Sequence, residues 1–203
     1  MTDDTLSLAL LDVRRAYRLI HAYQRRVCDI LAALDTTAAH NQLAFHGWYA
    51  TEFDEPVRKG KRFFGTGQWT WPMLPMYDVT CSWRSDSTQR KRPRLDVRVR
   101  ADNGFATSGE EPVPADFEPA QACASILSIR MMRSKGPGVN WDHVDSRLDE
   151  RAPDADPSCV LDIGKAQVWA TCLDLDLAKL AAPDALDRLV LRPVNSWAQN
   201  TPE

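Results

Sequence analysis

The most unusual group of charged side chains lies between residues 84 and 100. This segment carries seven positive residues against two negative ones, so its net charge is +5 in a chain of formal net charge -3. Guanidinium and ammonium groups bind carboxylates and phosphates. The segment therefore predicts a surface for an anionic partner, consisting of Arg84, Arg90, Lys91, Arg92, Arg94, Arg98 and Arg100.

The alternative for these cations is a solvated edge strand, where positive charge prevents aggregation. An acidic protein surface and a phosphate backbone both fit the recognition hypothesis. Nucleic acid is left open but not favoured as a partner, because no aromatic residues are interleaved with the cations on the same face.

A second candidate site is aromatic. Four tryptophans occur within 36 positions, and such rings each bury ~150 to 250 Å² in a folded protein. The first expectation is a core beneath a long helix, and the alternative is an open pocket for a small molecule. The residues concerned are Trp48, Trp69, Trp71 and Trp83.

A third candidate is the acidic segment that contains Asp142, His143 and Asp145. Carboxylates and imidazole are metal ligands, and a metal with an open coordination position activates water for hydrolysis. One histidine with nearby acids is also typical of a hydrated turn or short helix. We therefore keep a metal-dependent hydrolase or nuclease only as the alternative, and we expect no cofactor.

The elements that position these residues follow from periodicity. Apolar and polar residues alternate over residues 77–84 and again over 94–101, which predicts two half-buried strands joined by a polar turn. Alternation places Arg94, Arg98 and Arg100 on one face, and antiparallel pairing can add Arg84. Further strands are expected near residues 43–53, 62–71, 122–132 and 167–177, whereas 103–119 and 134–158 resemble loops.

The clearest signal of all is an apolar ladder at spacings of three and four near the start of the chain, which predicts one helix over about residues 4–35. Such a helix is roughly 45 Å long, more than most single domains cover. A partner helix or self-association is therefore expected. The ladder consists of Leu6, Leu10, Val13, Tyr17, Ile20, Gln24, Val27, Leu31 and Leu34.

Together these elements predict a single α+β domain over residues 1–203. A long N-terminal helix packs on a mostly antiparallel sheet of five or six strands, within about residues 42–177. Pro183 begins a short helix over about residues 183–192, which Pro193 ends.

Composition narrows the function classes. A hydrophobic fraction of 44% with 26% charged residues is ordinary for a folded protein, and no stretch is apolar enough to span a membrane. Five scattered cysteines without a C-x-x-C pair, and an acidic N-terminus, favour a reduced cytoplasmic protein. The leading hypothesis is a non-enzymatic binding or assembly module that forms a homo-oligomer through its first helix and contacts an anionic partner.

Overall fold

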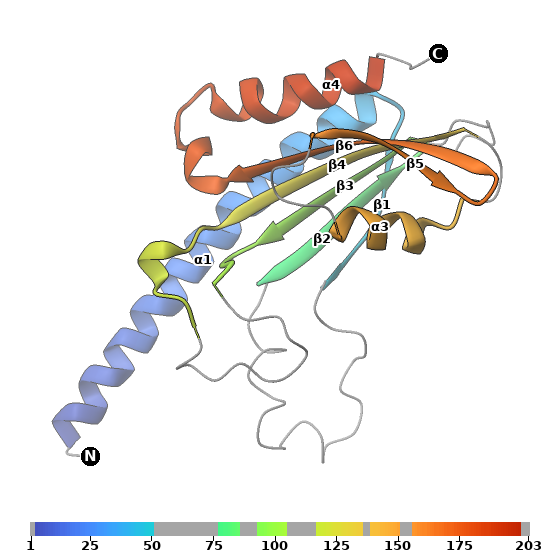
Figure 1. Cartoon of the computed structure of the whole chain (residues 1–203). Helices are drawn as coiled ribbons and strands as arrows, with labels where there is room; N and C mark the ends of the chain where they lie inside the picture. The colour runs from blue at the N-terminus through green and yellow to red at the C-terminus, as the bar shows by residue number, and fades with distance from the viewer. Residues whose placement is uncertain are drawn as a thin grey trace.

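The computed structural model describes residues 3–50, 77–85, 93–104, 117–135, 139–150 and 156–199. Its fold class is α+β, as predicted: a long helix, a sheet of six strands and a short C-terminal helix (Figure 1). The main elements are α1 (Asp3–His40), β1 (Ala44–Ala50), β2 (Asp78–Arg84), β3 (Pro93–Arg100), β4 (Ile126–Lys135), α3 (Trp141–Asp149), β5 (Ser158–Ile163), β6 (Ala166–Asp176) and α4 (Arg192–Gln199). Short 3-10 helices occupy Ala120–Ala122 and Leu177–Ala181, and a π-helical turn occupies Asp187–Leu191.

The sheet is antiparallel throughout, in the order β1-β2-β3-β4-β6-β5. The predicted hairpin is confirmed: β2 pairs with β3 in a register that sets Arg84 opposite Arg94 and Asp78 opposite Arg100. The strand preferred for residues 122–132 is β4, and the expected strand 62–71 lies outside the described residues. Alternation along each strand then assigns every side chain to one of two faces.

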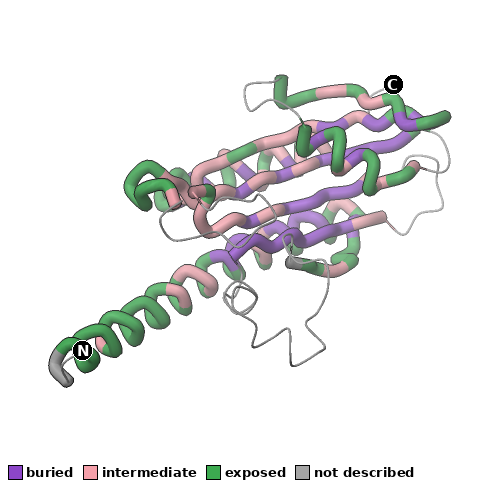
Figure 2. The backbone as a smooth tube through the Cα atoms, turned by 60° about the horizontal axis from the view of Figure 1, so that its bottom comes forward, coloured by how far each residue is buried: buried purple, intermediate pink, exposed green. Residues whose placement is uncertain are grey.

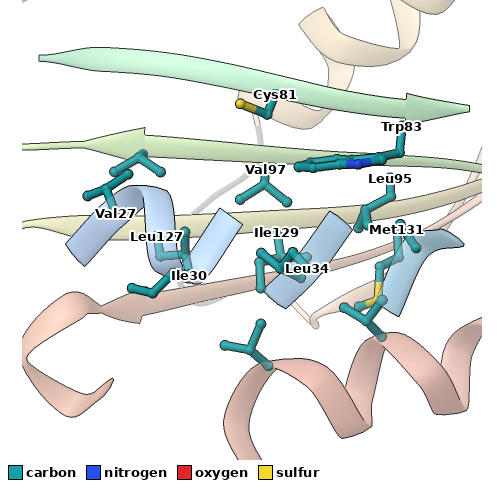
Figure 3. Packing of buried hydrophobic residues seen from close by; sticks show 14 of the residues in the cluster. Val27, Ile30, Leu34, Cys81, Trp83, Leu95, Val97, Leu127, Ile129 and Met131 are labelled. Carbon is teal, nitrogen blue, oxygen red and sulfur yellow. The ribbon is translucent and has the colours of Figure 1, made fainter. Parts of the chain in front are cut away.

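One face of the sheet carries the main core beneath α1 and α4. Side chains from β2, β3 and β4 meet the C-terminal half of α1, as Figure 3 shows for the central layer. The members shown there include Val27, Ile30, Leu34, Trp83, Leu95, Val97, Leu127, Ile129 and Met131.

The opposite face carries a smaller core beneath α3. Met132 points into it, while its neighbour Met131 points into the main core, as the two-residue period of a strand requires. The smaller core also holds Val144 and Leu148 of α3. The rest of this face, along β2 and β3, is polar.

The first helix continues about one turn beyond its predicted end and reaches His40. Thr36 and Thr37 lie beyond the predicted end. Their hydroxyls donate to the carbonyls of Ala32 and Ala33, four residues earlier, which is compatible with helix. The helix ends where Gln42 adopts a left-handed conformation, at φ 60°.

The polar segment before β5 also differs from the prediction, because it contains the nine-residue helix α3. The side chain of Asn140 caps this helix by accepting hydrogen bonds from the amides of Asp142 and His143. Strand β5, at the edge of the sheet, was not predicted either. Short elements of this kind give weak periodicity.

The predicted end of the last helix is wrong. Helical structure continues through Pro193 to Gln199. Immediately before the proline, the amide of Arg192 donates to the carbonyl of Asp187 in a π-helical turn, a local adjustment that is common where a helix meets an irregularity. The following residues are held by Arg133, which donates to the carbonyls of Trp197 and Ala198.

Candidate functional site

Two surfaces are candidates for a functional site. One is a polar groove between the sheet and α3, and the other is the N-terminal end of α1. On the polar face of the sheet, Arg94, Arg98 and Arg100 project from one side of β3, and Arg84 lies on the same face because it pairs with Arg94. Arg90, Lys91 and Arg92 lie outside the described residues. The face expected from the alternation is thus present in the described part of the hairpin.

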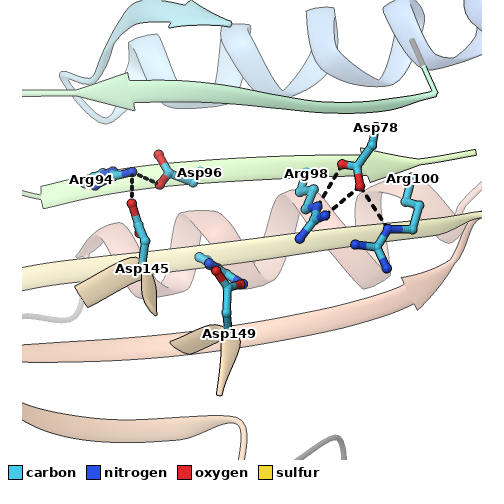
Figure 4. Close-up of polar contacts among 8 residues, drawn as sticks. Asp78, Arg94, Asp96, Arg98, Arg100, Asp145 and Asp149 are labelled. Atoms are coloured by element: carbon cyan, nitrogen blue, oxygen red, sulfur yellow. Dashed lines mark hydrogen bonds and ion pairs between the residues drawn. The ribbon is translucent and has the colours of Figure 1, made fainter. Parts of the chain in front are cut away.

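Most arginines of this face are already bound to carboxylates of the same chain (Figure 4). Arg98 donates to both oxygens of Asp78, at 2.8 and 2.6 Å, and Arg100 donates to Asp78 at 2.9 Å. Burial alone opposes ionisation of Asp78, but the two guanidinium groups outweigh it and hold its pKa below the usual range. Asp78 therefore neutralises part of the positive charge of this face within the same chain.

A second ion cluster ties the sheet to α3. Arg94 is 3% exposed, and its guanidinium contacts Asp96 at 2.5 Å and Asp145 at 2.9 Å. The ring of Trp141 lies 5.2 Å from the same guanidinium. Burial raises the pKa of Asp145, since desolvation and the neighbouring Asp96 exceed the effect of Arg94. Arg130 pairs with Asp149 further along α3.

A cavity of about 650 Å³ opens between these clusters. Its wall combines β1 to β4 with the first turns of α3, and it includes Tyr49, Arg84, Arg94, Ser128, Trp141 and Asp145. Three buried polar atoms in this wall have no hydrogen-bond partner among the described residues: Nε of Arg84, Nε of Arg94 and Oδ1 of Asp145. The cavity has the size and mixed lining of a small-molecule site.

The acidic segment considered for metal binding forms part of α3. Asp145 is bound to Arg94, whereas Asp142 and His143 are exposed. Within the described ranges, no group of three or more His, Cys, Asp or Glu residues is arranged to hold a metal ion.

The two described tryptophans of the aromatic candidate differ in exposure. Trp83 is buried beneath α1 at 1% exposure, while Trp48 on the edge strand β1 is 65% exposed. Trp69 and Trp71 lie outside the described residues. Trp141, which the sequence did not single out, contributes the aromatic ring of the groove.

Sequence reasoning also missed Asp78 and Arg130 as members of the polar face. The alternation in β2 already assigned Asp78 to a polar position, so the missing step was its pairing with Arg100. No local signal brings Arg130 or Trp141 to the groove, because they come from β4 and α3.

The second surface is the N-terminal part of α1, residues 5–22, which we call the arm. Every residue of the arm is exposed except Leu11 and Ile20, which are half-buried. Figure 2 shows this part of the helix extending away from the buried body. The apolar ladder is thus divided: Val27 and Leu34 are buried in the main core, whereas Leu6, Leu10, Val13 and Tyr17 are 48%, 47%, 48% and 67% exposed.

The chain belongs to the PM0109 family, whose model matches residues 3–190. The match includes the whole of α1, so the arm is part of the family's own sequence. No curated protein matches the chain, and no solved structure does. Among the described residues, none of the helices combines the length and the hydropathy required to cross a bilayer.

Proposed function

We propose that this protein is a non-enzymatic assembly module whose arm pairs with the arm of a second copy. The observation that carries the proposal is the exposed part of the apolar ladder. Four apolar side chains follow one another at spacings of four, three and four, and each is between 47% and 67% exposed. A row of this kind is the pattern by which one helix packs along another.

The sequence of the arm favours antiparallel pairing. Within the arm, the negative Asp12 is followed by the positive Arg14, Arg15 and Arg18. In the sequence, Asp3 and Asp4 precede the arm, and Arg25 and Arg26 follow it. Antiparallel helices bring these opposite charges together, whereas parallel helices align like charges.

Steric considerations support the same orientation. The buried body begins near Tyr23, at one end of the arm. Antiparallel arms centred near Arg15 would hold the two bodies at opposite ends and pair Leu10 with Ile20, and Val13 with Tyr17. Both layers then contain only apolar side chains, and the polar Gln24 meets Leu6 near the end of the contact.

The expected contact between the cationic hairpin and an acidic partner remains a secondary part of the proposal. Arg94, Arg98 and Arg100 are engaged by Asp78, Asp96 and Asp145. Only Arg84 has no ion-pair partner among the described residues of this face. A cytosolic location is also proposed, supported by five free cysteines.

Light scattering on the eluate of a size-exclusion column tests the proposal. We expect the full chain to elute as a dimer at micromolar concentration, and Leu10→Glu with Tyr17→Glu to raise the dissociation constant by at least roughly 100-fold, because charges then enter an apolar contact. Glutamate preserves helix propensity. A monodisperse monomer at high micromolar concentration would overturn the proposal.

A matched control uses the same change elsewhere on the arm. Leu8 and Leu19 are 64% and 72% exposed and lie off the ladder. Leu8→Glu with Leu19→Glu is therefore expected to leave the dimer intact. If this control dissociates the dimer as strongly as the ladder variant does, the proposed contact face is incorrect.

A further inference from the structure

The groove beneath α3 has a composition that the assembly role does not use. Its wall contains four cations, Arg84, Arg94, Arg98 and Arg130, and four anions, Asp96, Asp142, Asp145 and Asp149. The charges therefore balance overall, which does not favour a polyanion. Some of these charged groups nevertheless have no ion-pair partner among the described residues. A ligand that binds in the groove would have to pair with those groups.

On the cationic side, Arg84 is half-buried and its Nε has no partner among the described residues. It lies directly opposite Arg94 in the β2–β3 ladder, and both residues line the cavity. Arg94 is neutralised by Asp96 and Asp145, but no carboxylate of the described chain neutralises Arg84. An oxyanion in the groove would supply the missing charge.

On the anionic side, Asp145 uses Oδ2 to bind Arg94, and its buried Oδ1 has no hydrogen-bond donor in the described part of the chain. Asp142, also in the wall, has no ion-pair partner in the described part of the chain. Arg84 is opposite Arg94 in the strand ladder and Asp145 is bonded to Arg94, so the unpaired donor and the unpaired acceptor belong to residues on either side of one arginine. Figure 4 shows the contact between Arg94 and Asp145. Buried polar atoms without partners require an explanation, and a bound molecule provides one.

We propose that this groove binds a small organic zwitterion, whose carboxylate pairs with Arg84 and whose ammonium group donates to Asp145. The cavity of about 650 Å³ accommodates such a molecule with its hydrocarbon part beside Trp141 and Tyr49. Arg94 acts as the fixed element of the site. Its side chain is buried, its guanidinium pairs with Asp96 and Asp145, and the ring of Trp141 packs against it.

The test is calorimetric titration of the full chain with the common amino acids and with ω-amino acids from glycine to 6-aminohexanoate. Butyrate, butylamine and γ-butyrobetaine serve as matched probes, since they lack the ammonium, the carboxylate and the N–H donor respectively. We expect binding of at least one zwitterion, with each matched probe binding at least about 10-fold more weakly. If butyrate binds as well as the zwitterions, a simple anion site replaces the proposal.

Variants locate the binding. Arg84→Met is expected to weaken binding of the zwitterion by about 10-fold or more. The substitution removes the contact to the ligand carboxylate without breaking an ion pair of the fold. Arg147→Met, on an exposed part of α3 outside the groove wall, is the control and is expected to bind normally. Unchanged binding by Arg84→Met, or no binding of any zwitterion at about 10 mM, overturns the proposal.

Discussion

The indole nitrogen of Trp83 donates a hydrogen bond of 2.7 Å to Oδ1 of Asp35, and this bond joins β2 to α1. Trp83 is 1% exposed, and its ring packs edge-on against the ring of Phe45, with the two ring centroids 5.5 Å apart. The bond adds a polar contact between α1 and the sheet to the apolar packing of Ile30 and Leu34 in the main core.

Asp35→Ala is expected to destabilise the fold by about 1 to 3 kcal/mol, because it leaves the indole N–H buried without a partner. Urea unfolding measured by tryptophan fluorescence gives the change in free energy of unfolding. Asp29→Ala is the matched control, since Asp29 is exposed on the same helix, and it should change stability by less than about 0.5 kcal/mol. Equal losses in the two variants would contradict a specific role for the Asp35–Trp83 bond.

The pKa of Asp78 predicts a dependence of stability on pH. Arg98 and Arg100 overcome the effect of burial and lower this pKa in the folded protein. The ionised group therefore stabilises the fold above the unfolded pKa of about 3.9, and this contribution is lost as the pH falls through the lower folded value. Asp78→Asn should lower the free energy of unfolding by about 2 kcal/mol at pH 7.

The difference between wild type and Asp78→Asn should then shrink as the pH falls below about 4, because the unfolded chain becomes protonated there first and Asp78 in the folded protein follows only at its lower pKa. Chemical denaturation from pH 3 to pH 7 measures it. Asp12→Asn is the control, because the Asp12–Arg15 pair is 74% and 66% exposed and contributes little at any pH. A difference that stays constant across this range would contradict the ionic role of Asp78.

The cysteines should react unequally. Burial, with a smaller contribution from Cys28, raises the pKa of Cys81 to about 11. At pH 8 its thiolate fraction is then on the order of one in a thousand, and its 6% exposure limits access further. Cys28 is exposed, so iodoacetamide followed by peptide mass spectrometry should show Cys28 modified well before Cys81. Equal rates in the folded protein would contradict the packing of Cys81.

Cys28 also reports the orientation of the proposed dimer. If antiparallel arms cross near residue 15, spin labels on the two Cys28 side chains lie ~40 Å apart along the helices, whereas parallel arms bring them to ~10 Å. Double electron–electron resonance distinguishes these distances in a chain whose other reactive cysteines are replaced by serine. A short distance would contradict antiparallel pairing while leaving dimerisation itself intact.

Much of the fold was predictable because its signals are local. The alternation around Cys81 and Val97 predicted the hairpin, and the ladder through Val27 and Leu34 predicted the long helix. The sequence did not reveal α3 or β5, because short elements give few periods and α3 depends on a single cap at Asn140. Pro193 was misread because a π-helical turn admits it within helical structure.

The groove could not be assembled from the sequence. The cations of the hairpin could be recognised as a group from the sequence. Their ion-pair partners come from other parts of the chain: Asp78 lies on the adjacent strand, and Asp145 lies on a helix about fifty positions after Arg94. A sequence records the charges on a strand, and only register and packing determine which of them are neutralised.

By itself, the sequence determined the periods: a helix with one apolar row, alternating strands, and a cationic hairpin. Tertiary structure decided how each pattern is used. The sheet is shorter than the helix, so it covers Ile30 and Leu34 and leaves Leu10 and Tyr17 exposed. Likewise, α3 crosses the polar face of the sheet and engages Arg94. Spacing along a chain fixes which side chains share a face, whereas the finite extent of the packed layers fixes which part of that face is buried.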